Sequence, residues 1–162
     1  MKLRSILVFL FILPGAFLQA KVPLQNFDRA VFYATMASGI MEDIDKQLTL
    51  LDLAQIQEKE AYEGAMLMRK SGLLKKAAEK LKFFKKGRIK LETAIAKDGS
   101  NAEYRFLRLA IEEHAPKVVK YKADLESDKR SVIDSFQSLS AVVQQAIIDY
   151  SKNSRILHPK DL

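Results

Sequence analysis

The stretch from residue 73 to residue 97 constrains the fold of this chain more than any other part of the sequence. Its apolar residues recur at spacings of three and four, which places them on one stripe of an α-helix: Leu74, Ala77, Ala78, Leu81, Phe84, Leu91, Ala94 and Ile95. Gly87 falls on the same stripe, where a glycine costs up to about 1 kcal/mol relative to alanine. We therefore expect a long amphipathic helix in which Gly87 marks a kink or the close approach of another helix.

Helical spacing of apolar residues continues through most of the chain after Lys21, where glycine and proline are few. It predicts further helices at about 28–38, 41–53, 56–70, 102–113, 124–138 and 141–153. Between the helices at 73–97 and 102–113, Gly99 can adopt the left-handed conformation that ends a helix. Ser100 and Glu103 have the spacing of a capping box, so a tight helical hairpin is expected at this turn.

The first twenty residues have the three parts of a secretory signal peptide. Lys2 and Arg4 form a basic start, residues 6–13 are an unbroken apolar run, and Ala20 is a small residue at a plausible cleavage point. The apolar run is shorter than the roughly 20 residues that span a bilayer. We therefore expect export to the periplasm or the medium, with an uncleaved N-terminal membrane anchor as the alternative.

The composition of the chain excludes cysteine-based chemistry and argues against a nucleic-acid-binding domain. The chain has no cysteine, which excludes disulfides, thiolate metal sites and a lipid-modified cysteine. Its net charge is +7, and removal of Lys2 and Arg4 leaves about +5 on residues 21–162, which is modest for a nucleic-acid-binding domain. We expect a signal peptide at 1–20, an all-helical domain at 21–154 and a frayed C-terminal tail at 155–162.

No arrangement of residues indicates an enzyme or a cofactor. His114 follows Glu112 and Glu113, but adjacent helical residues point in different directions, and no nucleophile accompanies the histidine. Neither His114 nor His158 stands three residues after a glutamate, as the bundle di-iron motif requires. We therefore expect no catalytic residue, no metal site and no cofactor.

A lysine face is expected opposite the apolar stripe of the helix at 73–97, formed by Lys75, Lys82, Lys86 and Lys90. A basic amphipathic helix of this kind can bind an anionic membrane surface. A solvated helix face whose apolar side lies in the core accounts for the same pattern and is the simpler interpretation.

A second cluster of polar residues stands on the helix at 102–113. Arg105 and Arg108 are one turn apart beside Tyr104, and Arg69 or Lys70 from a neighbouring helix could join them to hold a partner's carboxylate. Surface salt bridges from the two arginines to Glu103 and Glu112 are the simpler alternative.

Residues 61–65, with the sequence AYEGA, and residues 91–103, with the sequence LETAIAKDGSNAE, resemble the helical repeats of tetratricopeptide proteins. Small residues on facing stripes let such antiparallel helices pack closely. The whole chain also resembles small exported all-helical bacterial proteins of unassigned function. The first resemblance implies an array of helical hairpins that binds proteins.

Taken together, these features predict an all-α fold: a single domain of about six helices packed as antiparallel hairpins, as a tetratricopeptide-like array or an irregular bundle. The expected function is that of a non-enzymatic exported module that binds an envelope protein through a helical groove near Arg69, Tyr104, Arg105 and Arg108. The alternative is peripheral association with a membrane through the helix at 73–97.

Overall fold

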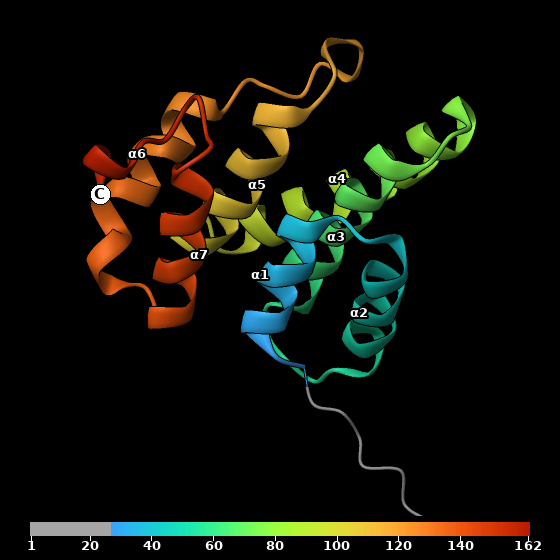
Figure 1. Ribbon diagram of the computed structural model, residues 1–162, viewed down its shortest axis with the longest axis horizontal. Coiled ribbons are helices and arrows are strands. Elements are labelled where there is room, and N and C mark those ends of the chain that lie inside the picture. The colour runs from blue at the N-terminus through green and yellow to red at the C-terminus, as the bar shows by residue number, and fades with distance from the viewer. Residues whose placement is uncertain (1–26) are drawn as a thin grey trace, which may run out of the picture.

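The protein is all-helical, as the spacing of its apolar residues predicts. The computed structural model describes residues 27–162 and contains seven α-helices there, one in each of the seven ranges that the apolar spacing predicts (Figure 1). They are α1 (Arg29–Ser38), α2 (Met41–Leu53), α3 (Lys59–Leu73), α4 (Ala77–Lys97), α5 (Ala102–His114), α6 (Leu125–Ser135) and α7 (Ala141–Ser151). Three short 3-10 helices follow α5, α6 and α7: η1 (Lys117–Val119), η2 (Phe136–Ser138) and η3 (Pro159–Asp161). The signal peptide expected at 1–20 lies outside the described residues.

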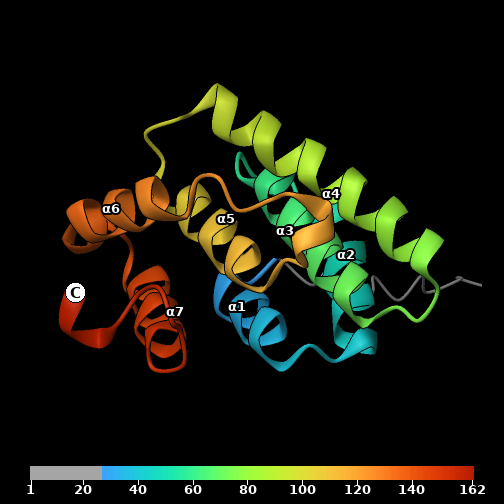
Figure 2. The ribbon, with the colours of Figure 1, turned by 90° about the horizontal axis from the view of Figure 1, so that it is seen from above.

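Helix α5 runs through the middle of the molecule and separates two hydrophobic cores. Leu107 and Ile111 belong to a core that α5 shares with α1, α2, α3 and α4. Phe106 and Leu109 belong to a second core with α6, α7 and the C-terminal segment. Seen from above, α1 and α7 lie along one side of α5, and α4 lies along the opposite side (Figure 2).

Two glycines allow α3 and α4 to pack closely. A Cβ atom on Gly64 would lie 2.8 Å from the Gly87 carbonyl oxygen, and a Cβ atom on Gly87 would lie 2.5 Å from the Gly64 carbonyl oxygen. Both distances are shorter than a carbon–oxygen contact allows, so neither position accepts a larger residue without separating the helices. The expected close approach at Gly87 is therefore confirmed.

The beginning of α4 is less buried than its apolar stripe predicts. Phe84, Leu91 and Ile95 are buried, but Ala77 and Ala78 are exposed and Leu81 keeps 45% of its surface. The start of α4 and the end of α3 form a hairpin end that extends from the body of the molecule (Figure 1). Assigning Ala77, Ala78 and Leu81 to the core was therefore wrong.

The turn between α4 and α5 differs from its predicted chemistry. The left-handed glycine among residues 27–162 is Gly39, whose φ is +64° at the end of α1, and not Gly99. The cap of α5 is Asn101, whose side-chain oxygen accepts the amides of Glu103 and Tyr104. Ser100 instead donates to Asp98 Oδ1. The hairpin forms where expected, because an Asx cap replaces the predicted capping box.

The C-terminal segment packs against the second core, so the expectation of a frayed tail was wrong. Leu157 is fully buried in that core. Asp161 accepts the His158 amide and forms an ion pair with Lys129 of α6 at 3.0 Å. Hydropathy alone could not predict this, because only Ile156, Leu157 and Leu162 in the segment are apolar.

Candidate functional site

A groove of about 930 Å³, which we call the α1–α7 groove, is the candidate site. Helices α1 and α7 form its walls, and α5 runs behind them (Figures 1 and 2). The end of α3 contributes Met68, Arg69 and Gly72. The groove therefore combines elements from both halves of the chain.

Small and flexible apolar side chains line much of this groove. Ala30, Ala34 and Ala37 follow one stripe of α1, and Ala141 and Ala146 stand on α7. Met36 and Met68 add unbranched side chains that adapt to the shape of a neighbour. Alanines on facing walls leave room for the backbone of another helix or strand. The chemistry of the groove suits an apolar polypeptide segment.

Polar contacts at its edges hold the walls in place. On the α7 side, Glu113 accepts hydrogen bonds from the Tyr150 hydroxyl, the Ser154 hydroxyl and the Arg155 amide. Burial alone would raise the pKa of Glu113, but these hydrogen bonds outweigh it and lower the pKa below its usual range. On the α1 side, the Tyr33 hydroxyl donates to Glu103 at 2.7 Å.

Arg69 is the one residue of the predicted partner-binding cluster that lines the groove. Its Nε donates to the Met36 carbonyl oxygen at 2.8 Å, at the end of α1. A Cβ atom on Gly39 would lie 2.3 Å from Arg69 Nη2, so the glycine that ends α1 also makes room for this guanidinium. Arg69 thereby fixes the C-terminal end of the α1 wall.

The structure does not bring Arg69 together with the other three residues. Tyr104 is 3% exposed and belongs to the first core. Arg108 is 4% exposed and forms a bidentate pair with Asp128 of α6, with Nε at 2.6 Å and Nη2 at 2.8 Å. Arg105 donates to the same carboxylate at 3.2 Å. These two arginines join α5 to α6 and do not line the groove.

The expected partners of the arginines were Glu103 and Glu112, and the observed ones are Asp128, Glu92 and Asp124. The prediction paired residues within one helix, whereas the acceptors come from α4, α6 and the segment before α6. Sequence spacing gives no information on such contacts. Removal of one partner from a buried ion pair lowers the unfolding free energy by about 3–5 kcal/mol. An Arg108→Ala variant would therefore lose stability, and any loss of binding by it would not identify a binding residue.

Glu112 lies beside this ion-pair cluster without a partner of its own. Its side chain is fully buried, and neither carboxylate oxygen has a hydrogen bond within residues 27–162. Burial, with repulsion from Asp124 and Asp128, raises the pKa of Glu112 to about 7, although Arg108 opposes the shift. Glu112 is the described carboxyl group best suited to take up a proton near neutral pH.

The lysine face expected on α4 is only partly free. Lys75, Lys82 and Lys86 are exposed, and none of them has an ion pair within the described part of the chain. Lys90 instead forms an ion pair of 2.6 Å with Glu63 of α3. It therefore belongs to the contact between the two helices.

His114 lines the α1–α7 groove, and His158 is not among the residues that line it. His114 Nδ1 lies 3.1 Å from the Ala110 carbonyl oxygen in the last turn of α5, and His158 precedes η3. Residues 27–162 contain no group of three or more side chains that could hold a metal ion. None of their helices is both long and apolar enough to cross a bilayer.

The chain matches no protein-family model, no curated protein and no solved structure. Its functional interpretation consequently depends on the α1–α7 groove and on the distribution of surface charge. Sequence reasoning missed the lining of this groove. The stripe of Ala30, Ala34 and Ala37 was visible in the sequence, but α7, which faces it, lies more than 100 residues further along the chain.

Proposed function

We propose that this protein is an exported, non-enzymatic interaction module, tetratricopeptide-like in build, that binds a segment of an envelope protein in the α1–α7 groove. The observation that supports the proposal best is the groove itself: an open apolar channel with alanine-rich walls on α1 and α7. An amphipathic helix binds such a channel by placing its own apolar face in it.

The polar groups near the groove support a binding role rather than a catalytic one. The Tyr33 and Tyr150 hydroxyls donate to Glu103 and Glu113, and Arg69 donates to backbone carbonyls. Each of these groups already stabilises a wall of the groove.

A pair of matched substitutions tests this function. Ala34 in the groove and Ala96 on α4 are both exposed alanines within helices, so Ala34→Arg and Ala96→Arg make the same chemical change at two places. We expect Ala34→Arg to lose an envelope protein that the unsubstituted chain and Ala96→Arg both retain in affinity capture. Circular dichroism checks that both variants fold. Equal retention by the two variants would exclude the groove as the binding site.

Export is part of the proposal and has its own test. Cleavage after Ala20 would give an exported protein that begins at Lys21, which an intact mass measurement distinguishes from the full chain. An exported form of full-chain mass would instead support the N-terminal anchor.

A further inference from the structure

The positive charge of the chain is concentrated in two stretches, residues 73–90 and 116–123, which together we call the basic surface. They contain eleven basic residues and one acidic residue, Glu79, so their net charge is +10. The whole chain has a net charge of +7, which means that all remaining residues together are net negative. The charge is therefore strongly polarised.

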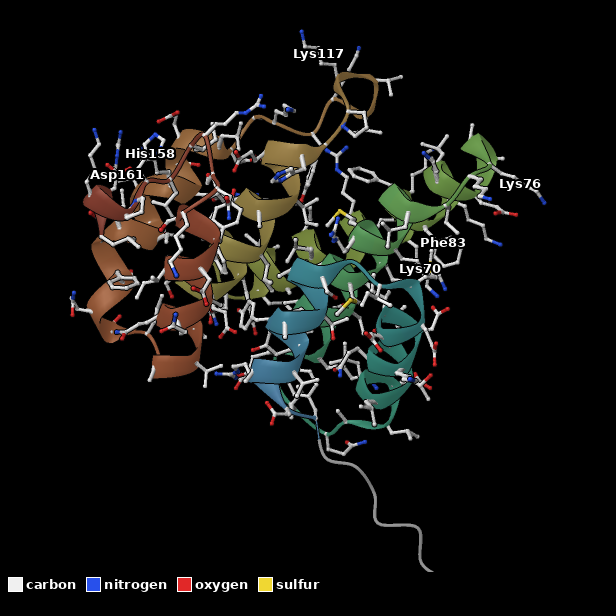
Figure 3. All side chains as sticks on the ribbon, in the orientation of Figure 1. Lys70, Lys76, Phe83, Lys117, His158 and Asp161 are labelled. Atoms are coloured by element: carbon white, nitrogen blue, oxygen red, sulfur yellow. The ribbon has the colours of Figure 1, made fainter. Side chains whose placement is uncertain are left out.

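The fold brings the two stretches together. Tyr121, just after η1, packs its ring edge-on against the ring of Phe84, with 5.6 Å between the ring centroids. The Arg88 guanidinium lies over the Tyr121 ring, 4.8 Å from the centroid of that ring. The Tyr121 hydroxyl donates to Glu92. These contacts hold the loop around η1 against α4. That loop, with Lys117, and the hairpin end, with Lys76, both project from the upper right of the molecule (Figures 1 and 3).

Apolar side chains are exposed among these basic groups. Val118 keeps 85% of its surface, although its neighbours Val119 and Tyr121 both pack against the first core. Leu81 keeps 45% of its surface on α4. Lys117 and Lys120 flank Val118, and neither forms an ion pair within residues 27–162. The loop is thus held at its base and presents an apolar tip between two unpaired cations.

We propose that the basic surface docks the protein onto an anionic lipid bilayer, with Val118 and Leu81 entering the headgroup layer. Unpaired lysines are attracted to anionic headgroups, and exposed apolar side chains add a contact that does not depend on charge. A nucleic acid or an acidic protein would use the same lysines but would leave Val118 in water. The combination of charge and apolar tip therefore favours the membrane.

The test is flotation of the full chain with vesicles of phosphatidylcholine alone or with added phosphatidylglycerol. We expect binding that requires phosphatidylglycerol and weakens as salt is added. Lys117→Gln and Lys120→Gln should each reduce affinity about fivefold, because one lysine near an anionic surface contributes about 1 kcal/mol. Lys160→Gln in η3, also an exposed lysine with no ion pair within residues 27–162, is the matched control. All variants keep the same N-terminal segment, so differences between them report on the basic surface.

A second pair of variants tests the apolar tip. Val118→Ser should weaken binding to the vesicles at a salt concentration where charge is screened, whereas Leu53→Ser, at a residue 61% exposed on α2, should not.

Equal affinity for both vesicle types, or wild-type affinity of the Lys117→Gln, Lys120→Gln double variant, would overturn the proposal. So would binding to short DNA without binding to anionic vesicles. Ala34→Arg should bind vesicles normally, which separates this surface from the groove.

Discussion

At the scale of single residues, the two glycines between α3 and α4 show how a small side chain determines packing. Gly87→Ala should destabilise the protein by about 1–3 kcal/mol, because its new Cβ would overlap the Gly64 carbonyl oxygen. Gly72→Ala is the control: no atom lies within 4 Å of a Cβ there, and alanine favours the helix by about 0.5–1 kcal/mol. Urea unfolding measures the change in unfolding free energy that each variant causes. Equal effects would contradict the close approach.

Glu112 gives a prediction on pH at the same scale. Its pKa is about 7 in the folded protein against 4.5 for an ordinary glutamate, so the folded state binds the proton more tightly than the unfolded state. The resulting stabilisation is fully present below about pH 4.5 and is lost as the pH rises through 7. The shift corresponds to on the order of 3 kcal/mol.

The Glu112→Gln variant removes this titration. We expect the unfolding free energy of the wild type to fall relative to that of the variant between pH 5 and pH 8, as measured by urea unfolding at both values. A constant difference between the two proteins across this range would show that Glu112 does not titrate there.

At the scale of elements, helix positions were predictable and helix ends were less so. The bounds of α2 agree with the prediction, and α1 and α5 differ from it by one residue each, because their apolar spacing stops where a cap or a proline follows. Helix α3 instead continues through Gly72 to Leu73, since nothing there requires the left-handed backbone that ends a helix at glycine. The chemistry of a cap depends on backbone angles, which the residue pattern around Gly99 did not specify.

The C-terminal segment, residues 155–162, is expected to contribute to the stability of the second core. Leu157→Ala should cost about 2–5 kcal/mol of unfolding free energy, because Leu157 is fully buried in the second core. Leu53→Ala, at an exposed leucine of α2, should change stability by less than about 0.5 kcal/mol. If the two alanine variants were equally stable in thermal and urea unfolding, the segment would be the frayed tail that its composition suggested.

At the scale of the whole molecule, the chain has two separate surfaces with different chemistry. The α1–α7 groove lies on one side of α5, and α4, with much of the basic surface, lies on the other (Figure 2). The sequence revealed the lysines of the second surface because they cluster in one helix. It could not reveal the groove, because Ala34 and Ala146 come to line the same groove only after α5 and α7 have packed.

Tyr104 and Arg108 illustrate the same limit. The spacing of Arg105 and Arg108 beside Tyr104 suggested a site for a partner's carboxylate, with surface salt bridges as the simpler alternative. The structure places Tyr104 in the first core and Arg108 in an ion pair with Asp128. A polar residue one helical turn from another can serve a surface or an interhelical contact, and only tertiary packing distinguishes the two.

Site-specific photo-crosslinking in the cell envelope tests the central claim most directly. A photoactivatable phenylalanine analogue would replace Ala37 or Gln145 in the groove, and Thr49 on the exposed face of α2 as the control. The proposed function predicts that irradiation joins the same envelope protein to positions 37 and 145 and not to position 49. Adducts at position 49 alone, or the same adducts at all three positions, would contradict binding in the α1–α7 groove.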